Sequence, residues 1–362
     1  MSTTKVYIID TKDVPEWLPL SLVFWPNYRF EIPEKRLFLK EIMAPYTKPF
    51  LDIVSDIEEA DFIAVPVDYF FVLEHAPEYL ARVYTFAKEL GKKVLLFDYT
   101  DYVDRVPKLP AHAVLFRVSV YRHHKQPSEI VMPYFVEDLG TNYAITPKER
   151  GSSLIVGYCG QARFGSIAKK WKAVAKRIAQ SILLRLRRDV RPAVHIRGIF
   201  WRNQVIRALR KGGTECRIIE RAFYSLHQSG VVADPKDIRR DYVENLKECD
   251  LALCVRGDAN ASQRFFEALS ASRIPLLLDT DVVLPLEGVV SYTDCVVRIP
   301  FDDIKCISRH VDVWSSTHES SVFVEMEQKA RKTYESFLRL DQYFDLVFDR
   351  ERSPYKTILY DA

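Results

Sequence analysis

Short apolar runs alternate with longer amphipathic stretches along most of this sequence. In the first half, five apolar runs have the length and composition of buried strands, at residues 6–9, 62–67, 93–97, 113–116 and 130–132. Between the second and third of these runs, residues 79–90 place apolar side chains at three- and four-residue intervals. This spacing predicts a helix that ends at Gly91. Strands that alternate with helices are typical of layered α/β proteins with mostly parallel sheets.

The second half repeats the pattern after residues 137–153, which are polar, lack periodicity and contain Gly140, Pro147 and Gly151. We interpret this stretch as an interdomain linker. Strands are predicted at residues 154–156, 193–196, 216–220, 251–255 and 275–278, the first of them ending in the turn Gly157-Tyr-Cys-Gly160. Helices are predicted at residues 203–211, 239–248 and 264–271, and a further helical pattern covers 319–340.

The length of 362 residues fits two domains, at roughly 150 residues for each. We expect an N-terminal Rossmann-like domain at residues 1–150 and a second doubly wound domain at residues 151–318. Residues 319–362 are expected to form a C-terminal helical segment that packs back on the first domain.

Charge changes this picture in one place. The chain has 52 Lys and Arg residues against 49 Asp and Glu, a net charge of +3, which disfavours a protein that coats nucleic acid. Residues 163–191, however, hold ten basic residues and one acidic residue, with apolar side chains at helical spacing. This basic amphipathic helix either packs on the core with its charged ends in water or lies against an anionic lipid surface or acceptor.

The sequence also bears on the cellular compartment. The six cysteines form no C-x-x-C pair, and several lie in apolar runs, where a reduced thiol packs as a small hydrophobe. The apolar run at residues 6–9 is too short for the core of a signal peptide. We therefore expect a cytoplasmic protein that can lie peripherally at the inner face of a membrane.

The segment at residues 251–286 carries the most chemistry. A buried strand there leads into Arg256-Gly257, and Ser262-Gln-Arg264 then opens a helix. Ligands of open α/β sheets bind at this carboxyl edge, and a helix N-terminus with nearby arginines suits a diphosphate. Glu267 follows on about the same helix face, where its carboxylate could accept hydrogen bonds from ribose hydroxyls.

In order and spacing, this segment resembles the C-terminal half of the exostosin-type glycosyltransferases. The resemblance covers residues 195–300 and includes a first arginine-bearing turn at Arg197-Gly198 and Trp201-Arg202-Asn203. Its other elements are Arg256-Gly257, Ser262-Gln-Arg264, Glu267-Ala268 and Leu284-Pro285-Leu286. The sequence departs from the family pattern at Val255, where proline is usual, and at Ser272-Arg273, which replaces a small residue and cysteine.

The resemblance implies an α/β protein of the GT-B fold, in which two Rossmann-like domains face a cleft. It also implies an inverting glycosyltransferase that moves a sugar from a nucleoside diphosphate, usually UDP, to a glycan or glycolipid hydroxyl. No metal ion is expected as a cofactor. The donor site then consists of three arginines on the diphosphate, Glu267 on the ribose, glycines close to the donor, and Phe223 or Tyr224 near the base. The donor-binding residues it implies are Gly160, Arg202, Tyr224, Arg256, Gly257, Ser262, Arg264 and Glu267.

Inversion requires a general base to deprotonate the acceptor hydroxyl. We expect this base in the first domain, after a strand, and favour Asp101, then Asp68, with Asp98 also a candidate. Arg117 and the pair His123-His124 could bind the acceptor or act instead. The D-x-D sequence at residues 279–281 resembles a metal motif, but it lies beyond the binding helix, and aspartates commonly cap such turns.

Two other functions stay open. A catalytically silent module could keep the pocket and bind a nucleotide sugar or a glycan without turnover. A nucleic-acid binder could use the basic stretch at residues 163–191 to contact phosphates.

Overall fold

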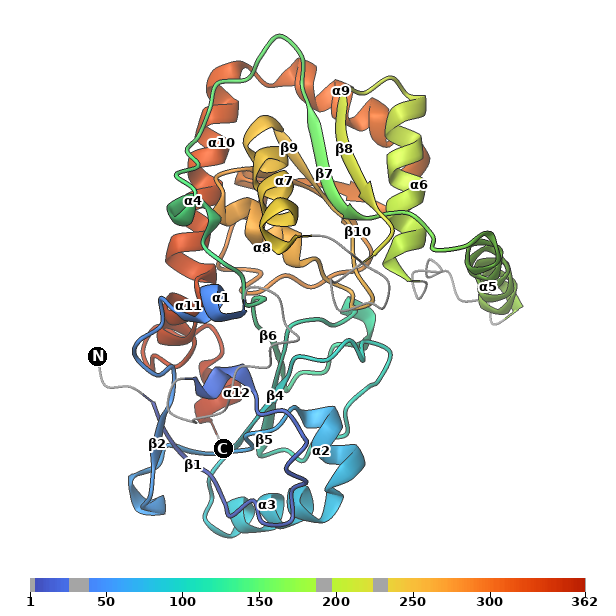
Figure 1. The fold of residues 1–362 in the computed structure, drawn as a ribbon. Helices are drawn as coiled ribbons and strands as arrows, with labels where there is room; N and C mark the ends of the chain where they lie inside the picture. The colour runs from blue at the N-terminus through green and yellow to red at the C-terminus, as the bar shows by residue number, and fades with distance from the viewer. Residues whose placement is uncertain (1–3, 26–38, 187–196, 224–233, 362) are drawn as a thin grey trace. The chain divides into compact units, whose positions relative to one another are not determined.

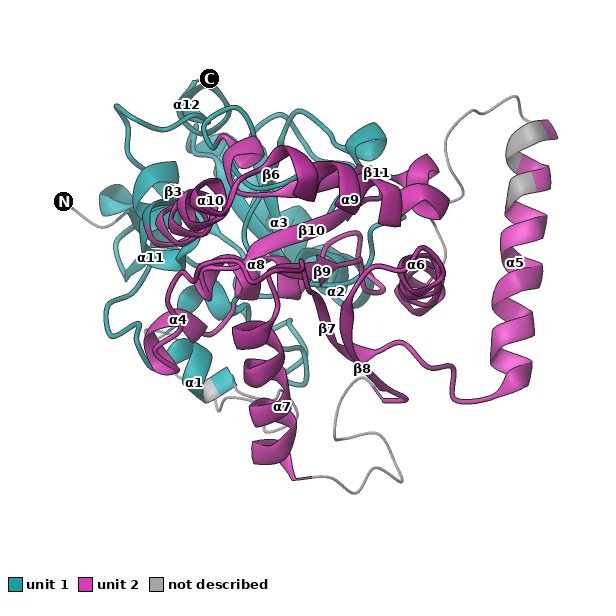
Figure 2. Cartoon of the chain, turned by 90° about the horizontal axis from the view of Figure 1, so that it is seen from above, with its two compact units in different colours: residues 1–135, 283–290, 336–362 teal, residues 136–282, 291–335 magenta. Residues whose placement is uncertain are grey.

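The chain forms two compact units in a computed structural model that describes residues 4–25, 39–186, 197–223 and 234–361. Unit 1 comprises residues 1–135, 283–290 and 336–362, and unit 2 comprises residues 136–282 and 291–335 (Figure 2). The two expected doubly wound α/β layers are confirmed, because each unit contains its own parallel sheet.

Unit 1 contains a six-stranded sheet in the order β2-β1-β3-β4-β5-β6, with every pair parallel (Figure 1). Its strands are β1 (Lys5–Tyr7), β2 (Asp52–Val54), β3 (Phe62–Ala64), β4 (Val94–Asp98), β5 (Ala113–Arg117) and β6 (Glu129–Val131). Its helices are α1 (Leu39–Met43), α2 (Tyr69–His75), α3 (Pro77–Glu89), α11 (Leu340–Val347) and α12 (Lys356–Tyr360). The apolar faces of α2 and α3 pack on β3, β4 and β5.

The opposite face of this sheet is covered by the C-terminal residues of the chain. Phe348, directly after α11, lies with its ring centroid 6.0 Å from that of Phe62 and 5.6 Å from that of Phe116. Tyr360 of α12 also contacts Phe62, at 5.5 Å between centroids. These aromatic contacts stabilise the packing of residues 336–362 in unit 1.

Unit 2 contains a five-stranded sheet in the order β11-β10-β9-β7-β8, again with every pair parallel. Its strands are β7 (Val156–Gln161), β8 (Cys216–Arg221), β9 (Leu251–Cys254), β10 (Ile274–Asp279) and β11 (Val297–Pro300). Its helices are α4 (Leu139–Asn142), α5 (Ile167–Leu186), α6 (Gly198–Lys211), α7 (Pro235–Glu248), α8 (Gln263–Ser270), α9 (Ile307–Thr317) and α10 (Ser320–Thr333).

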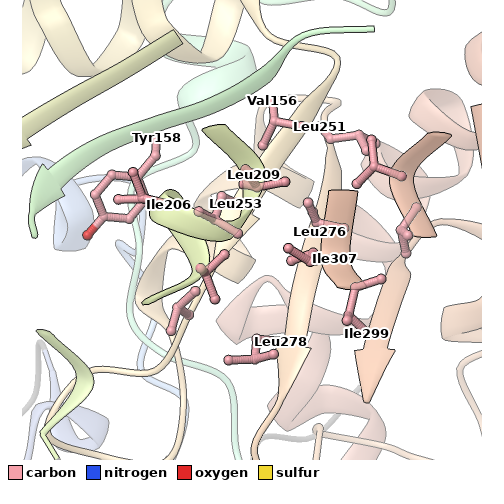
Figure 3. Packing of buried hydrophobic residues seen from close by; sticks show 14 of the residues in the cluster. Val156, Tyr158, Ile206, Leu209, Leu251, Leu253, Leu276, Leu278, Ile299 and Ile307 are labelled. Atoms are coloured by element: carbon pink, nitrogen blue, oxygen red, sulfur yellow. The ribbon is translucent and has the colours of Figure 1, made fainter. Parts of the chain in front are cut away.

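Alternating side chains of the unit 2 strands face two helical layers. Val156 and Tyr158 of β7 pack with Ile206 of α6 and Ile307 of α9, as Figure 3 shows for this cluster. Cys159 points to the other face, into a cluster formed with α7 and α8. This period of two is the pattern expected of a strand buried on both faces.

The strand order shows where the path of the chain through each sheet reverses its direction. In unit 2 the chain moves outward from β7 to β8 and then returns to β9 on the other side of β7. Ligands of such sheets bind at the carboxyl ends of the two strands that flank this switch point. In unit 2 these strands are β7 and β9, which end at Gln161 and Cys254.

The units divide the chain differently from the expected boundaries. We expected a linker at residues 137–153, but unit 2 begins at Val136, and the segment belongs to its fold. Leu139 and Ile145 are buried in the cluster beneath α7 and α8, so the segment has apolar anchors that its polar composition conceals. Residues 319–335 also belong to unit 2, because Phe323 and Met326 of α10 enter its core.

Strand β7 differs from its prediction as well. We expected a strand at residues 154–156 followed by a glycine turn, but Gly157 and Gly160 lie within β7. A Cβ at position 157 would come within 2.4 Å of the Cβ of Cys249, at the end of α7. The glycine therefore marks a close approach between strand and helix rather than a turn.

The family departure at Ser272-Arg273 has a structural counterpart in unit 2. Arg273 is buried and donates to the Leu246 carbonyl at 2.8 Å and to Glu327 Oε1 at 3.2 Å. The other oxygen of Glu327 accepts a hydrogen bond from the Lys148 amide at 2.7 Å. Arg273 thus joins the end of α7 to α10 through a buried ion pair.

This ion pair predicts a pH dependence of stability. Burial raises the pKa of Glu327 to about 7 from its ordinary value of 4.5, although Arg273 and Lys148 oppose the shift. The folded chain then binds a proton that the unfolded chain has released, so this group's contribution falls as pH rises from 4.5 to 7. We expect Glu327→Gln to remove this part of the pH dependence, a change of about 3 kcal/mol in unfolding free energy between pH 4.5 and pH 7.

Urea unfolding at several pH values measures this slope. Glu325→Gln on the same helix is the matched control, because Glu325 is exposed, and it should keep the wild-type slope. Equal slopes for Glu327→Gln and the wild type would contradict the prediction.

Helix α5 confirms the expected basic amphipathic helix but is not packed into the core. Ala173 and Val174 pack partly against the core of unit 2, whereas Ile167, Trp171 and Ile178 are exposed. Figures 1 and 2 both show α5 beyond α6, to one side of the sheet. Within the described ranges, no helix has the length and apolar character needed to cross a bilayer.

Candidate functional site

The carboxyl edge of the unit 2 sheet brings together residues from four elements. Gly160 and Gln161 end β7, Arg256 directly follows β9, Arg202 lies on α6, and Arg264 lies in the first turn of α8. Although these positions are far apart in the chain, hydrogen bonds and close contacts connect them. This cluster, which we call the arginine site, lies at the switch point of the sheet.

Arg264 is held against β7. Its guanidinium donates a hydrogen bond to the Cys159 carbonyl and lies 4.2 Å from the centroid of the Tyr158 ring. Gly160 has a φ of +155°, and a Cβ there would come within 2.7 Å of Arg264 Nη2. Glycine at position 160 therefore makes room for the arginine, in addition to any room it leaves for a ligand.

Arg202 and Arg256 are positioned by the contact between α6 and the loop after β9. The Gly198 amide, at the start of α6, donates to the Gly257 carbonyl at 3.1 Å. A Cβ at Gly198 would lie 2.0 Å from the Arg256 carbonyl oxygen, so only glycine allows this approach. Arg202 Nη1 then donates to the Gln161 carbonyl at 3.3 Å.

The arginine site retains donors that face no acceptor of this chain. Within the parts of the chain that the structure describes, the Nε atoms of Arg202 and Arg264 are buried without a hydrogen-bond partner. A buried guanidinium with an unused N–H favours an anionic partner, since an unmade hydrogen bond to a charged group is costly. The N-termini of α6 and α8 add positive dipole ends at the same edge.

Glu267 lies one turn into α8, where it is surrounded by hydrogen-bond donors. Its Oε2 accepts a hydrogen bond from the Tyr242 hydroxyl at 2.5 Å, and its Oε1 accepts one from Gln263 Nε2 at 3.3 Å. Arg239 Nη1 lies 4.0 Å from the same Oε1. Burial, followed by the charge of Glu267, raises the pKa of Tyr242 well above its ordinary value, which keeps the phenol a donor.

Arg239 and Tyr242 are partners that the sequence did not indicate. They lie on α7, and Tyr242 precedes Glu267 by 25 residues. Their spacing of three residues gives them a common helix face, but that spacing is ordinary on any helix. Only the packing of α7 beside α8 shows which carboxylate they meet.

The other predicted donor residues have different positions. Ser262 is buried and precedes the first residue of α8, and Phe223 follows β8. Tyr224 lies outside the described residues. Gly257 lies beside Arg202, because a Cβ at that position would lie 3.5 Å from Arg202 Nη2. The structure therefore brings Gly160, Gly257 and the three arginines together.

The candidate bases in unit 1 follow β3 and β4. Asp101 is exposed in the loop after β4. Asp68 is buried at the start of α2, and its Oδ1 accepts a hydrogen bond from the Tyr99 amide at 3.2 Å. Both positions are at the carboxyl edge of the unit 1 sheet.

Arg117 and Asp98 belong to a buried cluster of charged side chains. Arg117 donates to Glu129 Oε1 at 2.8 Å, and its Nε lies 3.6 Å from Asp98 Oδ2, with all three side chains almost wholly buried. Burial raises the pKa of Asp98 to about 6, although Arg117 opposes the shift. The sequence suggests that Arg117 could bind the acceptor. In the structure, its guanidinium is instead buried between the carboxylates of Asp98 and Glu129.

The remaining motifs do not form a metal site. Asp279 accepts hydrogen bonds from the Val282 amide and from Arg298 Nε, at 3.2 and 2.8 Å, and so closes a turn after β10. His123 and His124 lie in a short helical turn with ring centroids 4.3 Å apart. Over the described residues, no group of three His, Cys, Asp or Glu side chains could hold a metal ion.

Comparison with known proteins gives a family match that falls mostly in unit 2. Residues 195–312 match the family model of the Exostosin GT47 domain, and this match includes Arg202, Arg256, Arg264 and Glu267. Residues 195–312 thus form an exostosin-type glycosyltransferase domain. The match covers about a third of the chain and leaves residues 1–194 outside it. No curated protein sequence gives a match.

Two solved structures are similar over most of the chain. A glycosyltransferase from Rickettsia africae is 12% identical, with 92% of this chain and 85% of that chain covered and a TM-score of 0.37. Anabaena HepE in complex with UDP and glucose is 8% identical, with 99% and 97% covered and a TM-score of 0.34.

Proposed function

We propose that this protein transfers a sugar, with inversion, from a nucleoside-diphosphate donor to a hydroxyl of a glycan or glycolipid. UDP is the nucleotide that we propose, in line with the usual donor of exostosin-type enzymes. The observation that carries the proposal is the arginine site, with three arginines and two helix N-termini at the switch point of unit 2.

The arginine site suits a diphosphate for electrostatic reasons. Arginine presents a planar fork of N–H groups that binds two phosphate oxygens at once. Arg202 and Arg264 each retain a buried Nε–H for such an oxygen, within the described part of unit 2. The arginines would neutralise the charge that develops on the leaving diphosphate, so the proposal requires no metal ion.

Glu267 is proposed to accept hydrogen bonds from the ribose hydroxyls. Tyr242 and Gln263 orient its carboxylate, and each oxygen of a carboxylate can accept more than one hydrogen bond. Gly160 and Gly257 would let the donor approach the backbone, and Ser262 would contribute at the start of α8. Tyr224 stays a prediction for the base of the nucleotide.

The transfer step exchanges one carbon–oxygen bond for another. The acceptor oxygen attacks the anomeric carbon of the donor sugar, while the bond from that carbon to the diphosphate oxygen breaks. The electron pair of this bond leaves with the diphosphate, and the acceptor proton passes to a carboxylate base. We propose Asp101 as this base and Asp68 as the second candidate.

Asp101 is the stronger candidate because its side chain is exposed to solvent, whereas the side chain of Asp68 is buried. The partners of the protein would thus be a nucleotide sugar and a glycan or glycolipid. Contact with an anionic membrane would be confined to α5.

Two measurements on the full chain test this proposal. Thermal unfolding with UDP-, GDP- and CMP-linked sugars identifies the donor, since a ligand at about 100 times its Kd adds roughly 2.7 kcal/mol. Nucleotide release with glycan acceptors measures turnover. We expect stabilisation by a UDP-sugar, and Asp101→Asn should lower kcat about 100-fold or more while it keeps that stabilisation.

Asp104→Asn is the matched control, because Asp104 is an exposed aspartate in the same loop. Near-normal turnover in Asp101→Asn would exclude Asp101 as the base. If no nucleotide sugar stabilises the wild type, the donor site is wrong. Stabilisation without turnover on any acceptor would instead favour a catalytically silent binding module.

A further inference from the structure

Helix α5 presents a continuous apolar stripe to solvent. Four large side chains recur along one face at spacings of four, seven and four residues, which returns each to nearly the same direction on a helix. More than half of each side chain is exposed: Ile167 77%, Trp171 64%, Ile178 56% and Ile182 52%. Single exposed apolar side chains are common on protein surfaces, but a stripe of four on one helix indicates a binding surface.

A basic edge runs along another face of this helix. Helix α5 contains six Lys and Arg residues and no acidic residue along its 20 positions. Lys169, Lys172 and Lys176 are exposed and recur at three- and four-residue intervals, so they share a face. The helix therefore combines an apolar stripe with a parallel row of positive charges.

A third face of α5 attaches it to unit 2. Ala173 and Val174 pack partly against the core, and the guanidinium of Arg177 lies 5.4 Å from the centroid of the Trp201 ring on α6. This attachment uses the face that the stripe leaves free. The stripe and the basic edge therefore both stay exposed, because α5 contacts unit 2 through a different face.

We propose that α5 binds an anionic lipid bilayer and lies in the plane of the membrane surface. In this arrangement Trp171, Ile178 and their neighbours enter the boundary between headgroups and acyl chains. The lysines of the basic edge meet the negative headgroups. Interfacial helices of this kind gain affinity from both terms, namely buried apolar area and attraction to anionic lipid.

Charge complementarity favours a bilayer over two other occupants. A soluble polyanion would neutralise the lysines but leave the tryptophan and isoleucine side chains in water. A second copy of the chain would cover the stripe but would leave the lysines without a negatively charged partner. An anionic bilayer satisfies both parts of α5, because its acyl chains are apolar and its headgroups are negatively charged.

Vesicle binding of the full chain tests the proposal. We expect binding to vesicles of phosphatidylcholine with phosphatidylglycerol, and little binding to vesicles of phosphatidylcholine alone. Replacing Lys169, Lys172 and Lys176 together by Gln should weaken binding roughly 100-fold, at about fivefold for each lysine. Trp171→Ser combined with Ile178→Ser should weaken it by at least about tenfold.

Matched controls use side chains of the same kind elsewhere on unit 2. Lys211, Lys305 and Lys332 are exposed, and their joint replacement by Gln should leave binding unchanged. Val313→Ser removes an exposed apolar side chain of α9 and should also have no effect. The thermal midpoint of each variant shows that it is folded, since all these side chains are exposed.

Several outcomes would overturn the proposal. Failure to bind anionic vesicles at low salt would exclude it. Equal binding by the wild type and the Trp171/Ile178 variant, together with competition by dextran sulfate, would indicate a polyanion site. A dimer in sedimentation that the Trp171/Ile178 variant loses would indicate a second copy. The proposal depends on α5 alone, so it can fail while sugar transfer holds, or hold while transfer fails.

Discussion

Replacing Arg264 by alanine is expected to lower kcat/KM for sugar transfer by about 100-fold or more. Arg264 is the arginine most firmly built into the site, with the Cys159 carbonyl as its acceptor and the Tyr158 ring beneath it. A 100-fold loss corresponds to about 2.8 kcal/mol, which is within the range for removing one partner of a buried charge pair. Steady-state kinetics with the donor identified by thermal unfolding measures the effect.

Two further variants separate binding from folding. Arg264→Lys keeps the positive charge but loses the planar fork, so we expect an intermediate loss. Arg207→Ala, which removes an exposed arginine of α6, should leave both kinetics and donor stabilisation unchanged. Because Arg264 also contacts the backbone of β7, its alanine variant should unfold at a lower temperature without ligand. Wild-type kcat/KM in Arg264→Ala would refute the donor assignment.

Replacing Arg117 by methionine is expected to lower the free energy of unfolding by about 3–5 kcal/mol. Arg117 lies between Asp98 and Glu129, and no more than 1% of any of these side chains is exposed. Without the guanidinium, two carboxylates would stay buried with no cation between them. Since domains have total stabilities of about 5–15 kcal/mol, this loss should be visible as a large fall in the urea midpoint.

The triad offers a sharp control. A triple variant with Asp98→Asn, Arg117→Met and Glu129→Gln removes all three charges and should recover much of the lost stability. Arg105→Met disrupts an exposed pair with Glu74 in the same unit and should cost no more than about 1 kcal/mol. A loss in Arg117→Met as small as that in Arg105→Met would contradict the inferred cost of buried charge.

Local patterns predicted the elements that depend on neighbouring residues. The strands near residues 94–98, 113–117 and 251–254 are short apolar runs buried on both faces, and their composition indicates them directly. The helix opened by Ser262 and carrying Arg264 and Glu267 was also predicted, because its chemistry lies within a few residues of sequence. The family match at residues 195–312 includes this helix.

The sequence patterns did not predict two strands whose pairing depends on residues far away in the chain. Strand β2 has only three residues, all half-buried, and it exists because it pairs with β1 some 45 residues earlier. Strand β11 alternates buried and exposed side chains over four residues, which is too short for a clear period of two. Neither has a local signal strong enough to distinguish it from a loop.

The sequence by itself determined the α/β class, the order of most elements and the arginine-bearing segment, since each depends on local periodicity or on motifs within a few residues. Tertiary structure decided which distant residues meet. It paired Tyr242 with Glu267, buried Arg117 between two carboxylates and left the apolar stripe of α5 exposed. The physical reason is that burial and pairing depend on what lies opposite a side chain, which a linear pattern does not record.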